Sequence, residues 1–260
     1  MWRRSWGAGV SNALTIRNGE DLEGIFRAGR VVRSALDVMR KAVRAGMTTQ
    51  ALDDLCAGEL KKWGARSGPQ LAYGFPGVSC ISINEEAVHG IPSKTRTIRD
   101  GDLVKLDVVA ELDGYYADAA ISVPVGSVSS RKRRLAGCAQ SALRNALTVA
   151  RAGRPINGIG RAIQTEVERQ GFSVMPELGG HGVGRAVHEE PFVPNYDDPW
   201  NRQVLWTGLV IAVEPVISSG AGGSVTSDDW WTIRTADGSP SAHFEHTIII
   251  TRGDPIVVTY

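Results

Sequence analysis

The stretch from residue 103 to residue 123, LVKLDVVAELDGYYADAAISV, predicts a long β-hairpin. Its two arms, Leu103–Leu112 and Tyr115–Val123, are rich in β-branched, aromatic and other apolar residues. Asp113-Gly114 lies between them, and this dipeptide suits a two-residue hairpin turn because both of its residues tolerate a positive φ. This part of the chain is therefore expected to form antiparallel β-structure.

Each arm of the hairpin carries one carboxylate, Asp107 on the first and Asp118 on the second. Asp107 lies in the apolar segment from Lys105 to Ala110, where a carboxylate is costly to bury unless it has a partner. Counted outward from the turn, the two residues fall close to opposite each other, and such pairs can interact across strands. The hairpin can therefore direct both carboxylates at one ion.

Two more carboxylates interrupt apolar, strand-like segments. Glu214 follows Leu209–Val213 and precedes Pro215, and Glu245 precedes Thr247–Ile250. Four unpaired negative charges in such positions are prohibitive to bury, whereas two divalent cations would balance them. Oxygen ligands with one imidazole suit Mn, Fe, Co or Zn. By chemistry alone, this set predicts the site of a two-metal hydrolase.

The histidines lie near turns and glycine-rich segments rather than on ordinary helices. His89 follows a predicted strand, His181 and His188 bracket a glycine-rich stretch, and His243 and His246 flank Glu245. Taken singly, each candidate has a plainer explanation: an aspartate at a sheet edge is solvated, a glutamate pairs with an arginine, and a loop histidine bonds to backbone. Their joint occurrence favours the metal site.

Helical patterns precede and follow the hairpin. Residues 21–45 carry apolar side chains at helical spacing, and Gly46 ends this pattern. Thr48 or Thr49 is expected to cap a second helix, which runs to about Trp63. Two more are expected over residues 129–152 and 157–170.

The second and fourth of these helices match each other at one constant offset. Arg44-Ala45-Gly46 corresponds to Arg151-Ala152-Gly153. The further pairs are Leu52 with Ile159, Glu59 with Glu166, Leu60 with Val167, and Gly64 with Gly171. This pattern indicates either an internal duplication or a chance similarity between two amphipathic helices with glycine stops.

Strand-like segments lie at Val78–Ile83, Leu209–Ile217 and His243–Thr251, in addition to the hairpin. Helix pairs alternate with these antiparallel segments. This order favours an α+β fold in which the helices pack on one face of a curved sheet.

The composition excludes several classes of protein. The chain has 260 residues, of which 42% are hydrophobic and 22% charged, and its net charge of +1 argues against DNA as a partner. Its three cysteines are widely spaced, which is typical of reduced thiols in a cytoplasmic protein. No apolar run approaches the roughly 20 residues of a membrane span. The sequence contains no heptad pattern of the kind that forms coiled coils, so we expect a monomer.

The first residues are basic, with no acidic residue before Glu20. No apolar segment follows Arg3 and Arg4 as it would in a secretory signal. We expect residues 1–15 to be a flexible leader and residues 16–260 to form a single catalytic domain.

Five blocks, in order, resemble the motifs of the type I methionine aminopeptidases. They are residues 80–84 with 89–92, Asp107 with Asp113-Gly114 and Asp118, residues 180–191, residues 213–215, and residues 244–247. The resemblance extends from about Ile16 to the end of the chain. It implies the pita-bread fold, a curved antiparallel sheet with two pseudo-symmetric helix pairs on its outer face.

The resemblance also implies a metal-dependent enzyme that removes the initiator methionine from nascent proteins with a small second residue. Asp107 would bind one divalent ion (Co, Mn, Fe or Zn), and His181 with Glu214 would bind the other. Asp118 and Glu245 would bridge the two ions, and a hydroxide held between them would attack the peptide carbonyl.

Three residues would handle protons and substrate if the resemblance holds. Glu214 would accept a proton from the water, and His89 would assist proton transfer at the scissile amide. His188 would stabilise the oxyanion or orient the substrate.

The family pattern places Phe75, Cys80, Val187 and Trp231 around the methionine side chain, although Phe75 and Trp231 could equally be core residues. Val187 stands where bacterial members commonly have phenylalanine, and Ala72 where a tyrosine is usual. The pocket is therefore expected to be wider, or closed by another side chain, and strict selectivity for methionine is in doubt.

Two alternatives stay open at this level. One is an Xaa-Pro-type or broader-specificity aminopeptidase of the same fold, a class that usually carries a large additional N-terminal domain. The other is a metal-free peptide-binding paralogue, which would be expected to lose ligands, whereas all five are present. The basic run Arg131–Arg134 is either a solvated helix face or a contact with the ribosome.

Overall fold

The predicted hairpin is present and forms the central part of the first half of the molecule. The computed structural model describes residues 13–260, and residues 1–12, which make up most of the predicted leader, lie outside this range. Strands β4 (Leu103–Leu112) and β5 (Tyr115–Pro124) pair antiparallel along their whole length. The turn residues Asp113 and Gly114 have φ values of 52° and 80°, as this type of turn requires.

Two helices cover this hairpin. They are α2 (Gly19–Ala42) and α3 (Thr49–Trp63), and α2 packs directly against both strands. The first helix ends before its predicted end because Val43 adopts an extended conformation, with ψ of 126°. The second begins at its predicted cap, where the side chain of Thr48 accepts a hydrogen bond from the backbone N–H of Ala51.

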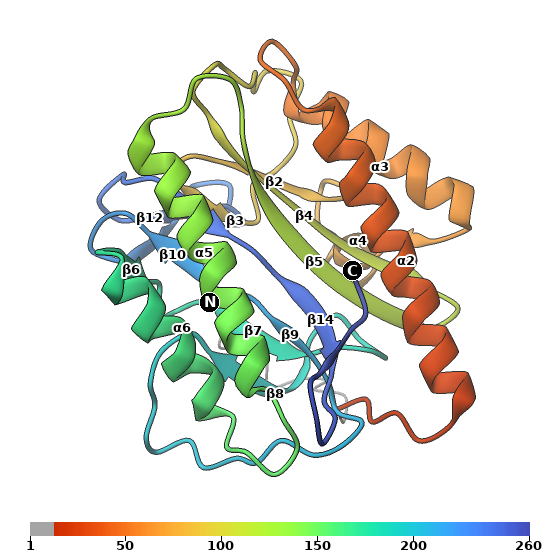
Figure 1. Cartoon of the computed structure of the whole chain (residues 1–260). Helices are drawn as coiled ribbons and strands as arrows, with labels where there is room; N and C mark the ends of the chain where they lie inside the picture. The colour runs from red at the N-terminus through yellow and green to blue at the C-terminus, as the bar shows by residue number, and fades with distance from the viewer. Residues whose placement is uncertain (1–12) are drawn as a thin grey trace.

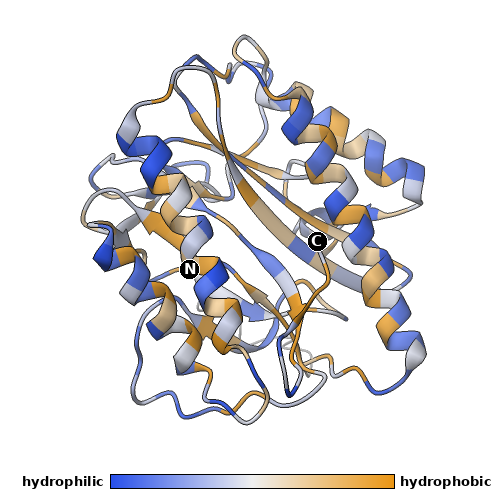
Figure 2. Cartoon of the chain, viewed as in Figure 1, coloured by the Kyte–Doolittle hydropathy of each residue, from blue (hydrophilic) through white to orange (hydrophobic). Residues whose placement is uncertain are grey.

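A second pair of helices covers the other half. These are α5 (Ser130–Val149) and α6 (Asn157–Arg169), which pack against each other. Figure 1 shows both helix pairs on the same side of the strands. In Figure 2 each long helix carries both hydrophobic and hydrophilic stretches, as expected for helices with one face on a core.

The correspondence between α3 and α6 extends to their three-dimensional structure. Gly64 and Gly171, just after these helices, have φ values of 68° and 76°. Glu59 and Glu166 are both buried, and each forms an ion pair with the basic residue three positions later. The matching left-handed glycines, buried glutamates and charge pairs support an internal duplication over a chance similarity.

Within residues 13–260 the strands form four sheets. The first contains β1 (Arg66–Ser67), β2 (Cys80–Ile83), β4 and β5, and the second contains β7 (Gly179–Gly182), β8 (Glu189–Pro194), β9 (Val210–Val213), β14 (His246–Ile249) and β15 (Ile256–Val257). A third contains β6 (Ser173–Val174), β10 (Val216–Ser218) and β13 (Ser241–His243). The fourth contains β3 (Glu86–Val88), β11 (Ser224–Thr226) and β12 (Ile233–Thr235).

Two predicted strands are each broken into two. The segment predicted as Leu209–Ile217 is divided into β9 and β10 at Glu214-Pro215, and the segment His243–Thr251 is divided between β13 and β14 at Phe244-Glu245. Proline has no backbone N–H to continue a ladder, which accounts for the first break. Both breaks fall where a predicted metal ligand lies.

One short helix was not predicted from the sequence. Helix α4 (Gly68–Tyr73) is capped by the side chain of Ser67 and ends at Gly74, which has a φ of 68°. Its six residues include a glycine and a proline, so no helical periodicity could mark it.

The N-terminal part of the described chain is attached to the second half. The backbone N–H of Val210 donates to the carbonyl of Leu14, and that of Ile16 donates to the carbonyl of Gly208. Within the described residues 13–260, Leu14 and Ile16 are thus hydrogen-bonded to the second half of the molecule. None of the helices in residues 13–260 combines the length and apolar character that a membrane crossing requires.

Candidate metal centre

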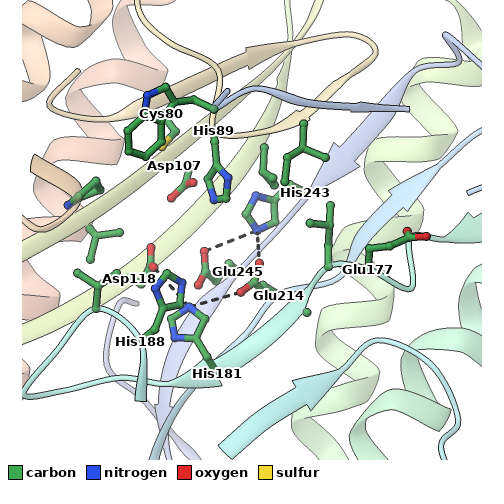
Figure 3. Close-up of a pocket in the computed structure, with 18 of the residues that line it drawn as sticks. Cys80, His89, Asp107, Asp118, Glu177, His181, His188, Glu214, His243 and Glu245 are labelled. Atoms are coloured by element: carbon green, nitrogen blue, oxygen red, sulfur yellow. Dashed lines mark ion pairs between the residues drawn. The ribbon is translucent and has the colours of Figure 1, made fainter. Parts of the chain in front are cut away.

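The five predicted metal ligands come from both halves of the molecule and meet at one cavity. Figure 3 shows their side chains directed toward a common space. Strands β4 and β5 supply Asp107 and Asp118, β7 supplies His181, and the two strand breaks supply Glu214 and Glu245. All five line a cavity of about 690 Å³. The structure therefore brings together residues that are up to 138 positions apart, from 107 to 245.

The two aspartates on the hairpin lie close to opposite each other, as the count from the turn predicted, and are diagonal neighbours. Asp118 pairs with Val109, and Asp107 pairs with Ala120. Because side chains alternate along a strand, Asp107 and Val109 share a face, and both carboxylates still point into the cavity. On its other side, Asp107 pairs with Cys80 of β2.

His181 is oriented to present one ring nitrogen to the carboxylates. Its Nδ1 lies 2.8 Å from the carbonyl oxygen of Gly182, so the proton belongs on Nδ1. Its Nε2 lies 3.5 Å from Oε1 of Glu214 and 3.9 Å from Oδ2 of Asp118. The free lone pair on Nε2 therefore faces the acidic cluster, as it does in metal-binding histidines.

The backbone around Asp118 is held from the second half of the molecule. The hydroxyl of Thr247 accepts from the N–H of Asp118 at 2.9 Å and donates to its carbonyl at 2.8 Å. The neighbouring N–H of Glu245 donates to the carbonyl of Ala120 at 2.9 Å. These bonds join β5 to the segment before β14 and keep the two carboxylates in register.

The carboxylates are too close together and too deeply buried to be charged without counter-ions. Burial raises the pKa of Asp107 to about 7. It also raises the pKa of Asp118, Glu214 and Glu245 well above the usual range, and repulsion between the carboxylates adds to this. Within residues 13–260, Oδ1 of Asp118 and Oε1 of Glu245 have no hydrogen-bond partner. Divalent cations would satisfy both the charge and these atoms, so the residues fit the metal ions that the sequence implied.

The proposed proton-transfer residues also lie at the cavity. His89, at a φ of 58°, and His188 both line it, and the rings of His188 and His181 are 4.2 Å apart. Burial is the largest effect on His89 and lowers its pKa to about 4, while it lowers that of His188 well below the usual value. Both imidazoles are therefore neutral at pH 7, and each has one donor and one acceptor nitrogen.

The four predicted pocket residues line the same cavity: Phe75, Cys80, Val187 and Trp231. Phe75 and Trp231 make an edge-to-face contact with ring centroids 5.2 Å apart. The cavity thus has an acidic part and an apolar part side by side. Whether these residues bind a methionine side chain stays a prediction.

Tyr73 and His243 are among the residues of the cavity wall that had no role in the sequence interpretation. Tyr73 lines it from α4, next to Ala72, which is exposed and is not among the residues of the wall. His243 lines it from the end of β13. The i, i+2 spacing of His243 and Glu245 could have indicated the second residue, because an extended segment puts both on one face. Nothing in the sequence marked Tyr73, since it lies on a helix too short to predict.

Comparisons with known proteins agree with this geometry. The profile of metallopeptidase family M24 matches residues 23–252. Methionine aminopeptidase 2 of Bacillus subtilis is 42% identical over 247 residues, which cover 95% of this chain and 99% of the relative. The crystal structure of the methionine aminopeptidase of Thermotoga maritima superposes with a TM-score of 0.91 at 36% identity, covering 95% of this chain and 99% of that one.

A more distant structure shares the fold alone. The prolidase of Pyrococcus furiosus superposes with a TM-score of 0.75 at 22% identity, and the match covers 95% of this chain and 65% of that one. These superpositions confirm the predicted pita-bread fold. The chain therefore belongs to metallopeptidase family M24, and within it to the methionine aminopeptidases.

Proposed function

We propose that this protein removes the N-terminal methionine from polypeptides in a reaction that depends on two divalent metal ions per chain. The observation that carries the proposal is the convergence of four carboxylates, two of them buried and two half-buried, and the imidazole of His181 on one space, next to an apolar compartment. Relatives and neighbours of similar length are named methionine aminopeptidases. The substrates would be newly made proteins with a small second residue, in the cytoplasm.

In this proposal each ligand has a distinct position. Asp107 would hold one ion and His181 with Glu214 the other, and Asp118 and Glu245 would contribute to holding both. When bound, ions such as Co, Mn, Fe or Zn acidify water and polarise a carbonyl oxygen. The carboxylates are the reason why two ions bind, because a single divalent charge would not balance four of them.

The chain's own residues perform the proton transfers. Glu214, at the break between β9 and β10, accepts a proton from the attacking water. His89 lies at the side of the cavity and exchanges a proton with the leaving amine. His188 donates a hydrogen bond to the substrate carbonyl oxygen as negative charge develops there.

Specificity for the first residue comes from the apolar compartment. Phe75, Cys80, Val187 and Trp231 would surround an unbranched, apolar side chain there. Methionine fits such a site because it is flexible and its sulfur makes favourable contacts with aromatic rings. We also propose that the protein acts as a monomer and that Arg131–Arg134, at the start of α5, contacts the ribosome.

The first test is hydrolysis of two tripeptides by metal-stripped protein, before and after addition of Mn, Fe, Co or Zn. Metal-dependent release of methionine from Met-Ala-Ser, without cleavage of Ala-Pro-Ser, is the expected result. Cleavage of Ala-Pro-Ser instead would move the protein to the Xaa-Pro class of aminopeptidase. No cleavage with any metal would overturn the proposal and favour a peptide-binding role.

The ligand assignment is tested by Asp107→Ala, with Asp54→Ala as a matched control on the exposed surface of α3. The Asp107 variant should lose metal retention and activity, while keeping the far-ultraviolet circular dichroism of the parent. The control should behave like the parent in all three measurements. An Asp107 variant with normal turnover would contradict the assignment.

A further inference from the structure

His243 is a buried histidine at the metal centre for which the family resemblance supplies no role. Its side chain is 2% exposed, and neither of its ring nitrogens has a hydrogen-bond partner within the described residues 13–260. A buried polar group without a partner is costly, so such groups are normally satisfied by protein, water or an ion. The ring is directed into the acidic cluster, as Figure 3 shows.

The backbone of His243 is fixed, so this direction does not depend on a mobile loop. The hydroxyl of Ser122 on β5 accepts from the N–H of His243 at 2.9 Å and donates to its carbonyl at 2.9 Å. His243 also pairs with Val216 of β10. The residue is thus held between two strands, with its ring on the same side of the chain as Glu245.

The distances around His243 repeat those around His181. Nε2 of His243 lies 3.6 Å from Oε2 of Glu214 and 3.6 Å from Oε2 of Glu245. Nε2 of His181 lies 3.5 Å from the other oxygen of Glu214. Each oxygen of the Glu214 carboxylate therefore faces the Nε2 atom of a different histidine.

These separations are too long for direct hydrogen bonds between the imidazole and the carboxylates. They suit atoms that share an ion, because ligands about 2.0–2.2 Å from a metal are themselves some 3–3.5 Å apart. Nε2 of His243 is at about such a separation from one oxygen of Glu214 and one oxygen of Glu245. Ligand atoms of Asp118, His181 and Glu245 likewise all lie within 4.8 Å of one another.

We infer that His243 is an additional nitrogen ligand of the metal centre and shares with Glu214 and Glu245 the ion that Glu214 holds. The centre would then have two imidazoles, one from each side of Glu214, where the family pattern supplies one. A second imidazole shifts preference toward Zn, Co or Fe and away from Mn, which favours oxygen ligands. This inference rests on the proposed metal centre but assigns a residue that the proposal does not need.

The test compares His243→Gln with His246→Gln. His246 is the matched control because it flanks Glu245 on the other side, and its Nδ1 lies 2.9 Å from the hydroxyl of Thr259 instead of facing the carboxylates. Metal-stripped protein is titrated with Zn, Co and Mn by calorimetry, and thermal unfolding confirms that each variant is folded. The affinity of His243→Gln for Zn and Co should fall about tenfold or more, with a smaller change for Mn. His246→Gln should match the parent.

A second measurement needs no variant to be stable. Proton NMR of the Co-loaded parent should show two exchangeable, hyperfine-shifted imidazole N–H signals, one from each ligated histidine. One signal in the parent, or equal losses of Zn and Mn affinity in His243→Gln, would overturn the inference and leave His243 as a residue that only supports the carboxylates. Failure of the parent to bind any metal would instead overturn the proposed function.

Discussion

The phenol oxygen of Tyr73 lies 2.5 Å from Nδ1 of His188, across a contact between helix α4 and the segment that follows β7. The two rings have centroids 5.6 Å apart. Burial raises the pKa of Tyr73 to about 12, so the phenol stays protonated. It therefore donates a hydrogen bond to Nδ1 of His188. The other ring nitrogen of His188 must then carry the proton, which makes it the donor that a developing oxyanion needs.

The first prediction follows from this contact. Tyr73→Phe removes the hydroxyl and keeps the ring, so His188 loses the bond that fixes its tautomer. We expect kcat with Met-Ala-Ser to fall about five- to tenfold, equivalent to one hydrogen bond, with little change in KM. Tyr196→Phe, a half-buried tyrosine outside the cavity wall, should match the parent. In a His188→Ala background, Tyr73→Phe should have no further effect on kcat; an equal loss there would show that Tyr73 acts independently of His188.

The second prediction concerns pH. In metal-stripped protein the pKa of Asp107 is raised to about 7, while in the unfolded chain it is about 3.9. At a pH between these two pKa values, folding of the metal-stripped protein therefore takes up a proton at Asp107. The stability from this group is present below about pH 4 and is lost as the pH rises to about 7.

Metal ions need the ionised carboxylate, so binding releases protons and becomes tighter as the pH rises through this range. Calorimetry in buffers with different ionisation enthalpies measures the released protons. Asp107→Asn cannot titrate, and its melting temperature should depend less on pH than that of the metal-stripped parent. Proton uptake on metal binding would contradict the raised pKa values.

The third prediction concerns the first residue of the substrate. Val187 is 3% exposed and lines the apolar compartment, where many bacterial relatives are expected to have a larger ring. We expect the parent to cleave Leu-Ala-Ser and Phe-Ala-Ser at measurable rates. Val187→Phe should lower kcat/KM for these peptides by about tenfold relative to Met-Ala-Ser, since each poorly fitted methylene costs about 1–3 kcal/mol.

Val149→Phe is the control for this substitution, because Val149 is exposed at the end of α5. It should leave the ratio of the three peptides unchanged. Equal losses of kcat/KM for all three peptides in Val187→Phe would indicate that the larger side chain overpacks the protein in general. A lower melting temperature in thermal unfolding would reveal such overpacking.

The fourth prediction concerns stability and two glycines, one within helix α3 and one directly after it. Gly58 lies on the exposed side of α3, where an added Cβ meets nothing within 4 Å. Gly64 follows the helix with a φ of 68°, a conformation that costs a residue with a Cβ about 1 kcal/mol. Gly58→Ala should raise the free energy of unfolding by about 0.5–1 kcal/mol, and Gly64→Ala should lower it by about 1 kcal/mol.

Urea denaturation measures both changes, and Met-Ala-Ser hydrolysis should be unaffected. Gly171→Ala, at the corresponding position after α6, should lower stability by a similar amount because Gly171 has a φ of 76°. A stabilising effect at Gly64 or Gly171 would contradict the left-handed conformation that both glycines adopt after their helices.

Local patterns determined much of this protein from the sequence alone. The Asp113-Gly114 turn set the hairpin, Thr48 capped α3, and glycines ended α3 and α6 close to the predicted positions. The carboxylates that interrupt apolar strands indicate a buried charged site without comparison to any other protein. These features depend on neighbours in the sequence, so backbone sterics, capping and hydrophobic periodicity suffice to predict them.

Only the tertiary structure decided which distant side chains meet. It broke two predicted strands at Glu214 and Glu245, and it brought Tyr73 to His188 over 115 residues of chain. It also turned His243 toward Glu214, a contact that no local pattern contains. Such contacts depend on how strands and helices from the two halves pack, and the energy that selects one packing is spread over the whole core rather than stored in any single segment.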